Sequence, residues 1–245
     1  MASNSFARQS EMIGFMSSIF GPYPFSASGG VVDDIDVGFA LENQTRPIYS
    51  VGFFGDQLGA DSVVVHELAH QWYGDSLAVA AWQHIWLNEG FATYAEWLWS
   101  KREGLGTADE IFRFWFSILP RNNPFWALTI GDPGPDNLFH FAVYIRGAMT
   151  LHVLRHTIGD DVFFELLNKW ATVYAGGNVT TDQFIAMAES LSGQELDDLF
   201  HTWLFTAQKP TRTLIPDAAV SHGDVPAIAR AEMERHDQEE LLATD

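Results

Sequence analysis

Two histidines four residues apart place the strongest constraint on how this chain can fold. Residues 66–70 read His-Glu-Leu-Ala-His. On a helix, residues four apart lie on one face, one turn from each other, so the imidazoles of His66 and His70 can reach the same metal ion. Glu67 is offset by about 100° in helical projection, so it can approach a water on that ion without taking a ligand position. The run also fits a pair of core histidines satisfied by hydrogen bonds, because apolar residues surround it.

A third residue favours the metal interpretation. Glu89 follows His70 after eighteen intervening residues, within Trp-Leu-Asn-Glu-Gly, where a second expected helix begins. Two histidines and one carboxylate suit zinc, with water as the fourth ligand. We therefore expect one zinc ion, held by His66, His70 and Glu89, with Glu67 as the general base of a hydrolytic reaction. Glu96, two turns beyond Glu89, is either an acceptor for a ligating histidine or an ordinary solvated glutamate.

The composition narrows the kinds of partner and site. The 245 residues include no cysteine, so a metal site must be built from histidines and carboxylates. Absence of cysteine also fits a reducing compartment, and we expect a cytoplasmic protein. The net charge of −19 disfavours nucleic acid as a partner. No apolar run reaches the length needed to cross a membrane, so we expect no membrane association.

The spacing of apolar residues predicts an α+β chain that is mostly helical. Residues 31–53, rich in Val, Ile and Phe, are expected to be extended, and the pattern is helical after residue 59. The expected helices are 6–20, 61–74, 88–103, 107–119, 137–158, 160–176, 180–192 and 194–206, with a short one near 225–241. We expect a catalytic domain over 1–210 and an acidic, poorly ordered tail over 211–245.

These motifs resemble the gluzincin zinc aminopeptidases, the family that includes aminopeptidase N and leukotriene hydrolase. The family pattern is H-E-x-x-H, eighteen residues and then Glu, usually within W-L-N-E-G-F-A, and this chain has HELAHQWYGDSL followed by WLNEGFATYAEWLW. Residues 39–43, FALEN, resemble the family's G-A-M-E-N segment, and residues 144–148, YIRGA, resemble its Tyr-x-x-Gly-Ala segment. The likeness runs from about residue 5 to residue 210. It implies a thermolysin-like catalytic domain, with a small N-terminal sheet region and zinc in the cleft beside it.

The resemblance also implies roles for residues outside the metal site. Glu42 is expected to bind the free α-amine of a peptide, with Ala40 and Leu41 lining the cleft beside it. Tyr144 is expected to donate a hydrogen bond to the developing oxyanion. From the residues alone, Glu42 is more simply a solvent-facing glutamate at a strand end, and Tyr144 is equally a core aromatic.

The activity that the resemblance implies is release of N-terminal amino acids from peptides with a free N-terminus. An endopeptidase and an epoxide hydrolase are alternatives on the same metal site, and a zinc-binding or assembly module with little activity is an alternative of another class. Phe39 departs from the family, which usually has Gly there. Almost nothing precedes residue 5, so we expect the family's N-terminal β domain to be absent. The surface facing it is expected to expose apolar residues within residues 6–25: Phe6, Phe15, Phe20, Tyr23 and Phe25.

Overall fold

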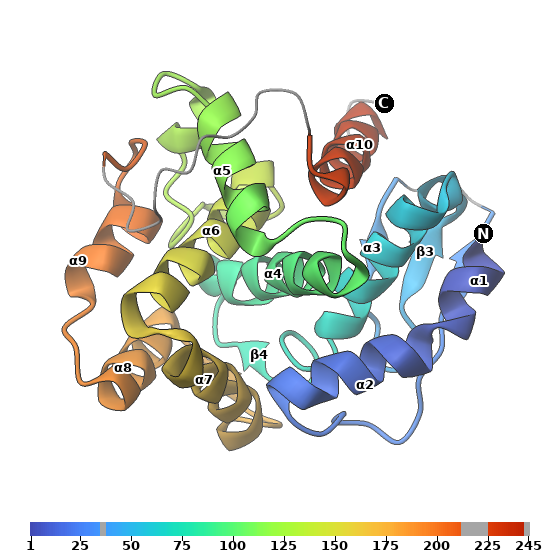
Figure 1. Cartoon of the computed structure of the whole chain (residues 1–245), viewed down its shortest axis with the longest axis horizontal. Helices are drawn as coiled ribbons and strands as arrows, with labels where there is room; N and C mark the ends of the chain where they lie inside the picture. The colour runs from blue at the N-terminus through green and yellow to red at the C-terminus, as the bar shows by residue number, and fades with distance from the viewer. Residues whose placement is uncertain (35–37, 212–224, 243–245) are drawn as a thin grey trace.

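The computed structural model describes residues 1–34, 38–211 and 225–242, and this part of the chain is mostly helical (Figure 1). Eight of its helices are long: α2 (Gln9–Phe20), α3 (Gln57–Ala69), α4 (Trp86–Glu103), α5 (Ala108–Ile118), α6 (Phe141–Ile158), α7 (Asp160–Val173), α8 (Thr181–Ser192) and α10 (Ala227–Leu242). Two are short: α1 (Ala2–Ala7) and α9 (Asp197–Phe200). The predicted α+β, mostly helical fold is confirmed.

Local chemistry explains where the central helices begin and end. Gly104 follows α4 in the left-handed conformation, with φ 72°, which glycine adopts at little cost. Thr107 then caps α5: its hydroxyl accepts a hydrogen bond from the backbone N–H of Glu110, whose carboxylate accepts one from the N–H of Thr107. The separation predicted between the helices over 88–103 and 107–119 is therefore confirmed, and each side of it has its own cap.

The extended N-terminal part forms a three-stranded sheet. Its strands are β1 (Val31–Asp33), β2 (Ala40–Leu41) and β3 (Ile48–Ser50), in the order β1-β3-β2. β3 pairs in parallel with β1 and antiparallel with β2, so β2 is an edge strand. A second pairing was not predicted: β4 (Ala78–Val79) runs parallel to β5 (Asn178–Val179), from segments far apart in the sequence.

Apolar exposure on the N-terminal side differs from the expectation. Of the five aromatic residues expected to be exposed within residues 6–25, Phe20 is buried and the other four are half-buried, and each contacts another aromatic ring. The expectation was wrong because four of these rings, all except that of Phe25, pack in or against the protein's own core. The sheet is exposed instead: Val31, Ile48 and Leu41 lie in register across its three strands, with 47%, 37% and 43% of their surfaces accessible.

Helix α4 lies in the middle of the molecule, with α3, α5 and α6 around it (Figure 1). α4 and α6 approach closely where Gly90 faces Gly147. A Cβ atom built on Gly90 would lie 2.9 Å from backbone carbons of Gly147, so a side chain there would push the helices apart. This contact positions the first turn of α4, which carries Glu89, beside α6, which carries Tyr144.

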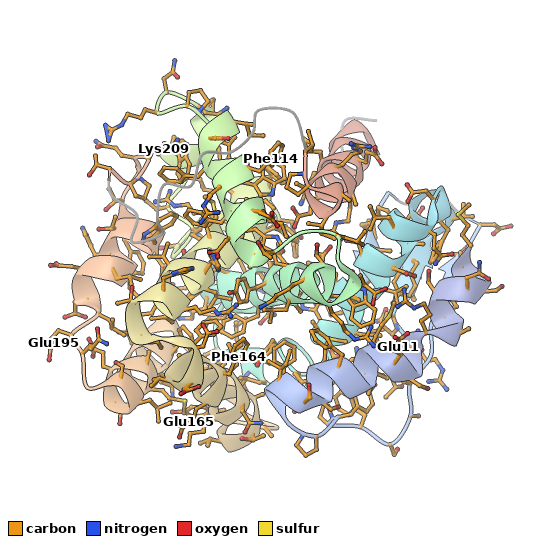
Figure 2. The ribbon with its side chains drawn as sticks, viewed as in Figure 1. Glu11, Phe114, Phe164, Glu165, Glu195 and Lys209 are labelled. Atoms are coloured by element: carbon orange, nitrogen blue, oxygen red, sulfur yellow. The ribbon has the colours of Figure 1, made fainter. Side chains whose placement is uncertain are left out.

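Ion pairs attach the first two helices to the helical core. Arg8 lies 2.6 Å from Asp61 of α3 and 2.7 Å from Glu103 of α4. Arg102 lies 2.6 Å from Glu11 of α2, which is labelled in Figure 2. The guanidinium of Arg102 also lies 4.5 Å from the centroid of the Trp99 ring, a cation–π distance. These contacts hold α1 and α2 against the two helices that carry the candidate metal ligands.

Helix α10 belongs to the segment for which the sequence predicted a poorly ordered tail with a short helix near 225–241. The helix is present and packs against α3, α4 and α5. Ile228, Ala229 and Glu232 are almost fully buried in this contact. Residues 212–224 and 243–245 of the predicted tail lie outside the described residues. Across the described ranges, no helix combines the length and the apolar character that a membrane span requires.

Candidate metal centre

Helix α3 presents the two histidines that the sequence singled out. Asp56 caps the start of the helix by accepting a hydrogen bond from the backbone N–H of Gly59. His66 lies in the last turn and His70 directly follows the helix, and both are buried, with 4% and 2% of their surfaces accessible. Their ring centroids lie 4.8 Å apart, as expected for residues one helical turn apart on the same face.

Glu89 completes the group from the first turn of α4. Its Oε2 atom lies 3.3 Å from Nε2 of His66 and 3.3 Å from Nε2 of His70. Two ligands bound tetrahedrally at zinc distances are separated by about 3.3 Å, so this spacing fits a zinc ion between the three atoms. Buried imidazole and carboxylate donors with a fourth position open are also the donor set of zinc sites in hydrolytic enzymes.

A hydrogen bond at the other ring nitrogen orients each histidine. Nδ1 of His66 lies 2.7 Å from Glu96 Oε1, and Nδ1 of His70 lies 3.0 Å from the carbonyl oxygen of Tyr73. Both acceptors favour a proton on Nδ1, which leaves the Nε2 lone pair directed towards Glu89 and an ion. Glu96 is fully buried, so of its two predicted roles the structure supports the acceptor and contradicts the solvated glutamate.

Glu67 is also buried at this centre. Burial raises the pKa of its carboxyl group to about 7, although His66 and His70 act in the opposite direction. Its Oε2 atom has no hydrogen-bond partner within the described part of the chain. A buried carboxylate oxygen without a partner is costly, and a water molecule or substrate at the centre would satisfy it.

The charges of the centre depend on one another. Burial alone would raise the pKa of Glu89, but His70 and His66 outweigh it and lower that pKa to about 2. Burial likewise opposes ionisation of Glu96, but Arg235 and His66 lower its pKa to about 2. Both carboxylates are therefore charged at neutral pH. Glu89 needs this charge to bind a cation, and Glu96 needs it to accept a strong hydrogen bond from the ligating imidazole of His66.

Tyr144 and Glu42 approach the centre from other elements. The Tyr144 ring, in the first turn of α6, is half-buried and lies 5.9 Å from the His66 ring. Glu42 follows β2, and its backbone carbonyl accepts a hydrogen bond of 2.9 Å from the side chain of Gln71, next to His70 in the sequence. Its charge contributes to raising the pKa of Glu67, which places its carboxylate within electrostatic reach of the centre.

The two remaining predicted residues lie on the edge strand β2 itself. Ala40 is half-buried and Leu41 is 43% accessible. Among the strands of the described residues, theirs pairs with β3 alone, so its other side offers backbone groups to an extended peptide.

Helix α10 contributes two residues that the sequence did not indicate. Arg235 donates hydrogen bonds to both oxygens of Glu96, at 2.8 and 3.2 Å. The His236 ring lies 4.9 Å from the Tyr144 ring and 4.5 Å from the Phe141 ring. Both residues stand in a segment without a recognisable motif, and nothing in the local pattern indicates that α10 returns to the centre.

The fold and the buried His-His-Glu centre place the chain in the class of zinc metallopeptidases. The family model described as the Peptidase family M1 domain matches residues 49–203, which is more than half of the chain. The chain therefore belongs to peptidase family M1. The matched segment contains all three candidate ligands together with Glu67, Glu96 and Tyr144.

Relatives and solved structures agree with this placement. Aminopeptidase M1-D of Oryza sativa subsp. japonica is 30% identical over 208 residues, which cover 74% of this chain and 23% of the rice protein. The M1 zinc metallopeptidase from Deinococcus radiodurans superposes with a TM-score of 0.74 at 29% identity, covering 86% of this chain and 46% of that one. A mutant of that enzyme bound to a Tyr-Ser-Ala substrate superposes with a TM-score of 0.70 at 27% identity, covering 85% and 46%. The chain thus spans less than half the length of each of these proteins.

Proposed function

We propose that this chain hydrolyses peptide bonds with one zinc ion and releases N-terminal amino acids. The observation that carries the proposal is the buried group in which Glu89 Oε2 lies 3.3 Å from the Nε2 atoms of both His66 and His70. His66, His70 and Glu89 would hold the ion. When bound, zinc supplies a Lewis acid that polarises the scissile carbonyl and makes water more acidic.

Glu67 is the general base in this proposal. It lies on the same helix as the two histidines, but its offset keeps it out of the ligand set. Its carboxylate takes a proton from the attacking water and passes that proton to the leaving amine. The buried Oε2 atom of Glu67, without a partner among the described residues, supports this role, because it is available to a water molecule or a substrate amide.

Tyr144 supplies the hydrogen bond to the oxyanion. The position of its ring, 5.9 Å from the ring of His66, supports this role because it brings Tyr144 close to the metal centre. Such a bond is stronger in the transition state than with the substrate carbonyl, because negative charge develops on the oxygen during attack. Its effect should therefore appear in kcat more than in KM.

Release of N-terminal residues depends on Glu42. Its carboxylate is the partner that the α-ammonium group of a peptide requires, and the hydrogen bond from Gln71, next to His70, to its backbone carbonyl supports a position beside the centre. The unpaired side of β2, at Ala40 and Leu41, supports the peptide backbone next to that amine. The aminopeptidase name of the rice relative supports the same substrate class.

Two assays test the proposal. A panel of aminoacyl reporter substrates should be turned over by the zinc-loaded protein, and a chelator should abolish the turnover. Peptides with a free N-terminus should be cleaved, whereas their N-acetylated copies should resist cleavage, because acetylation removes the charge that Glu42 binds. Equal cleavage of both would indicate an endopeptidase, and zinc binding without hydrolysis would indicate a zinc-binding module.

A further inference from the structure

A second group of metal-binding side chains lies where α5 begins and α6 ends. Asp109 stands in the first turn of α5, and His152 and His156 stand in the second half of α6. Asp109 Oδ1 lies 2.9 Å from Nε2 of His152 and 2.8 Å from Nε2 of His156. His152 lies eight residues beyond Tyr144, a rise of about 12 Å along the helix, so this group is separate from the candidate metal centre.

The second group repeats the geometry of the first. In each, two histidines four residues apart share a helical face, with ring centroids 4.8 Å apart. The ring planes are inclined by 75° in the first pair and by 79° in the second. In each, the third donor is a carboxylate from the first turn of another helix, Glu89 in α4 and Asp109 in α5. The two groups therefore offer the same donor set of two Nε2 atoms and one carboxylate oxygen.

The inner histidine of the second group is held in place. His152 is 2% accessible, and its ring packs beside Phe112 and Trp97. Its Nδ1 atom lies 3.0 Å from the hydroxyl oxygen of Tyr94. This hydroxyl can donate a hydrogen bond to Nδ1 while Nε2 carries the proton, and it can accept one from Nδ1–H when Nε2 binds an ion. A hydrogen bond at the second ring nitrogen is what ligating histidines use to fix their orientation, and here it aims Nε2 at Asp109.

The outer half of the group is open to solvent and can adjust. Side-chain accessibility is 28% for His156 and 39% for Asp109. The present N–O distances of 2.8 and 2.9 Å are hydrogen-bond distances, so an ion would have to widen them by about 0.5 Å and displace the two Nε2 protons. The neighbouring Arg155 opposes a cation only weakly, because Asp160 accepts two hydrogen bonds of 2.7 Å from its guanidinium.

We propose that Asp109, His152 and His156 bind a second divalent transition-metal ion, which joins the start of α5 to the end of α6. Imidazole nitrogens with one carboxylate suit Zn²⁺, Ni²⁺ and Cu²⁺ rather than Mg²⁺ or Ca²⁺, which prefer oxygen donors. The role of this ion is structural. The buried ring of His152 closes one side of the group.

The stoichiometry of zinc binding tests the proposal. Metal-stripped protein is dialysed to equilibrium against buffered zinc, and bound zinc per chain is measured by elemental analysis. The wild-type chain should bind two ions and His156→Ala should bind one. Asp109→Asn keeps an oxygen that accepts hydrogen bonds but loses the charge, so the second ion should bind at least tenfold more weakly.

A matched control excludes weak binding to surface carboxylates. Glu189, Glu195 and Asp197 form a third, acidic group, in which Glu195 and Asp197 are exposed, with the Glu195 side chain at the outer edge of the molecule (Figure 2). Glu195→Gln should leave both ions in place. One ion per chain in the wild type, or two ions retained by His156→Ala, would overturn the proposal.

Thermal unfolding gives a second measurement. An ion that binds only the folded protein stabilises it by mass action, so zinc added beyond one equivalent should raise the melting temperature of the wild type by several degrees. The same addition should leave the melting temperature of His156→Ala unchanged. A rise of equal size in both proteins would place the second ion elsewhere and would overturn the proposal.

Discussion

Arg235 donates a hydrogen bond of 2.8 Å to Oε1 of Glu96, the same oxygen that lies 2.7 Å from Nδ1 of His66. Two hydrogen bonds, with Glu96 between them, thus connect a residue of helix α10 to a candidate zinc ligand. Glu96 is completely buried, and a buried carboxylate is stable only when cations and hydrogen-bond donors surround it. α10 therefore contributes to the metal centre although it supplies no ligand.

Removing this guanidinium should weaken metal binding. In Arg235→Ala, Glu96 would lose the two hydrogen bonds that stabilise its buried charge. The hydrogen bond from His66 to Glu96 would then fix the orientation of the imidazole less firmly. We expect zinc affinity to fall by about 10- to 100-fold, the usual effect of losing a residue that supports a ligand. Competition with a chelator measures this affinity. Arg230→Ala, at an exposed position on the same helix, is the control, and equal affinity in the two variants would contradict the prediction.

Glu67→Gln should separate catalysis from metal binding. The variant keeps the size of the side chain but cannot accept the proton of the attacking water, so the rate should fall by about 10²- to 10⁴-fold. Zinc content should not change, because Glu67 is not among the three candidate ligands. Steady-state kinetics and metal analysis of the same preparation check both expectations. Glu165→Gln, at an exposed position of α7, should retain full activity, and loss of zinc from Glu67→Gln would assign that residue a different role.

The contact between α4 and α6 should tolerate no side chain at Gly90. A Cβ atom there would meet Gly147 at 2.9 Å, and relieving that overlap should cost about 1–3 kcal/mol of unfolding free energy. Gly14→Ala is the matched control, because a Cβ atom on Gly14, within α2, would have no atom within 4 Å. This variant should gain about 0.5–1 kcal/mol from its higher helix propensity. Denaturant unfolding measures the change in unfolding free energy of each variant relative to the wild type, and the two changes should have opposite signs.

Glu232 should make stability depend on pH. Burial raises the pKa of its carboxyl group to about 8, Glu96 adds to the rise, and Arg235, Trp97 and Trp115 oppose it. Since the folded-state pKa lies above the unfolded one, the contribution to stability is complete below about pH 4.3 and is lost as pH rises towards 8.

The measurement is the slope of unfolding free energy against pH. Over this window the group should lower the stability of the wild type by at most about 1.4 kcal/mol per pH unit. Glu232→Gln has no proton to lose, so its slope should be shallower by this amount, whatever its stability at a single pH. Parallel slopes for the two proteins would contradict the assignment.

Local sequence patterns were sufficient for most helices and for part of the site. The spacing of apolar residues and the capping residues predicted α4, α5 and α8 to within about two residues, because helix boundaries depend on nearby side chains. The His-Glu-Leu-Ala-His run indicated two ligands and a base for the same reason. The segment predicted as one helix over 194–206 instead divides into α9 and a π-helical turn, His201–Phe205.

Contacts between segments far apart in the chain could not be predicted from the local sequence. The parallel pairing of β4 with β5 joins residues about 100 positions apart, which no local pattern records. The aromatic residues near the N-terminus were expected on the surface, but Phe20 packs edge-on against Tyr73, with their ring centroids 4.9 Å apart. Apolar composition indicates that a residue will be covered, and tertiary packing decides what covers it.

The sequence by itself determined the chemistry of the centre. It specifies a helix with two imidazoles on one face, a glutamate beside them (Glu67), and a second glutamate further along the chain on another helix (Glu89). Tertiary structure decided which charged groups meet. Glu89 reaches the histidines because α4 packs against α3, and Arg235 reaches Glu96 because α10 returns across both helices. The physical reason is that helical spacing depends on bonds a few residues apart, whereas a buried charge is stabilised by any partner that the fold brings within hydrogen-bond distance.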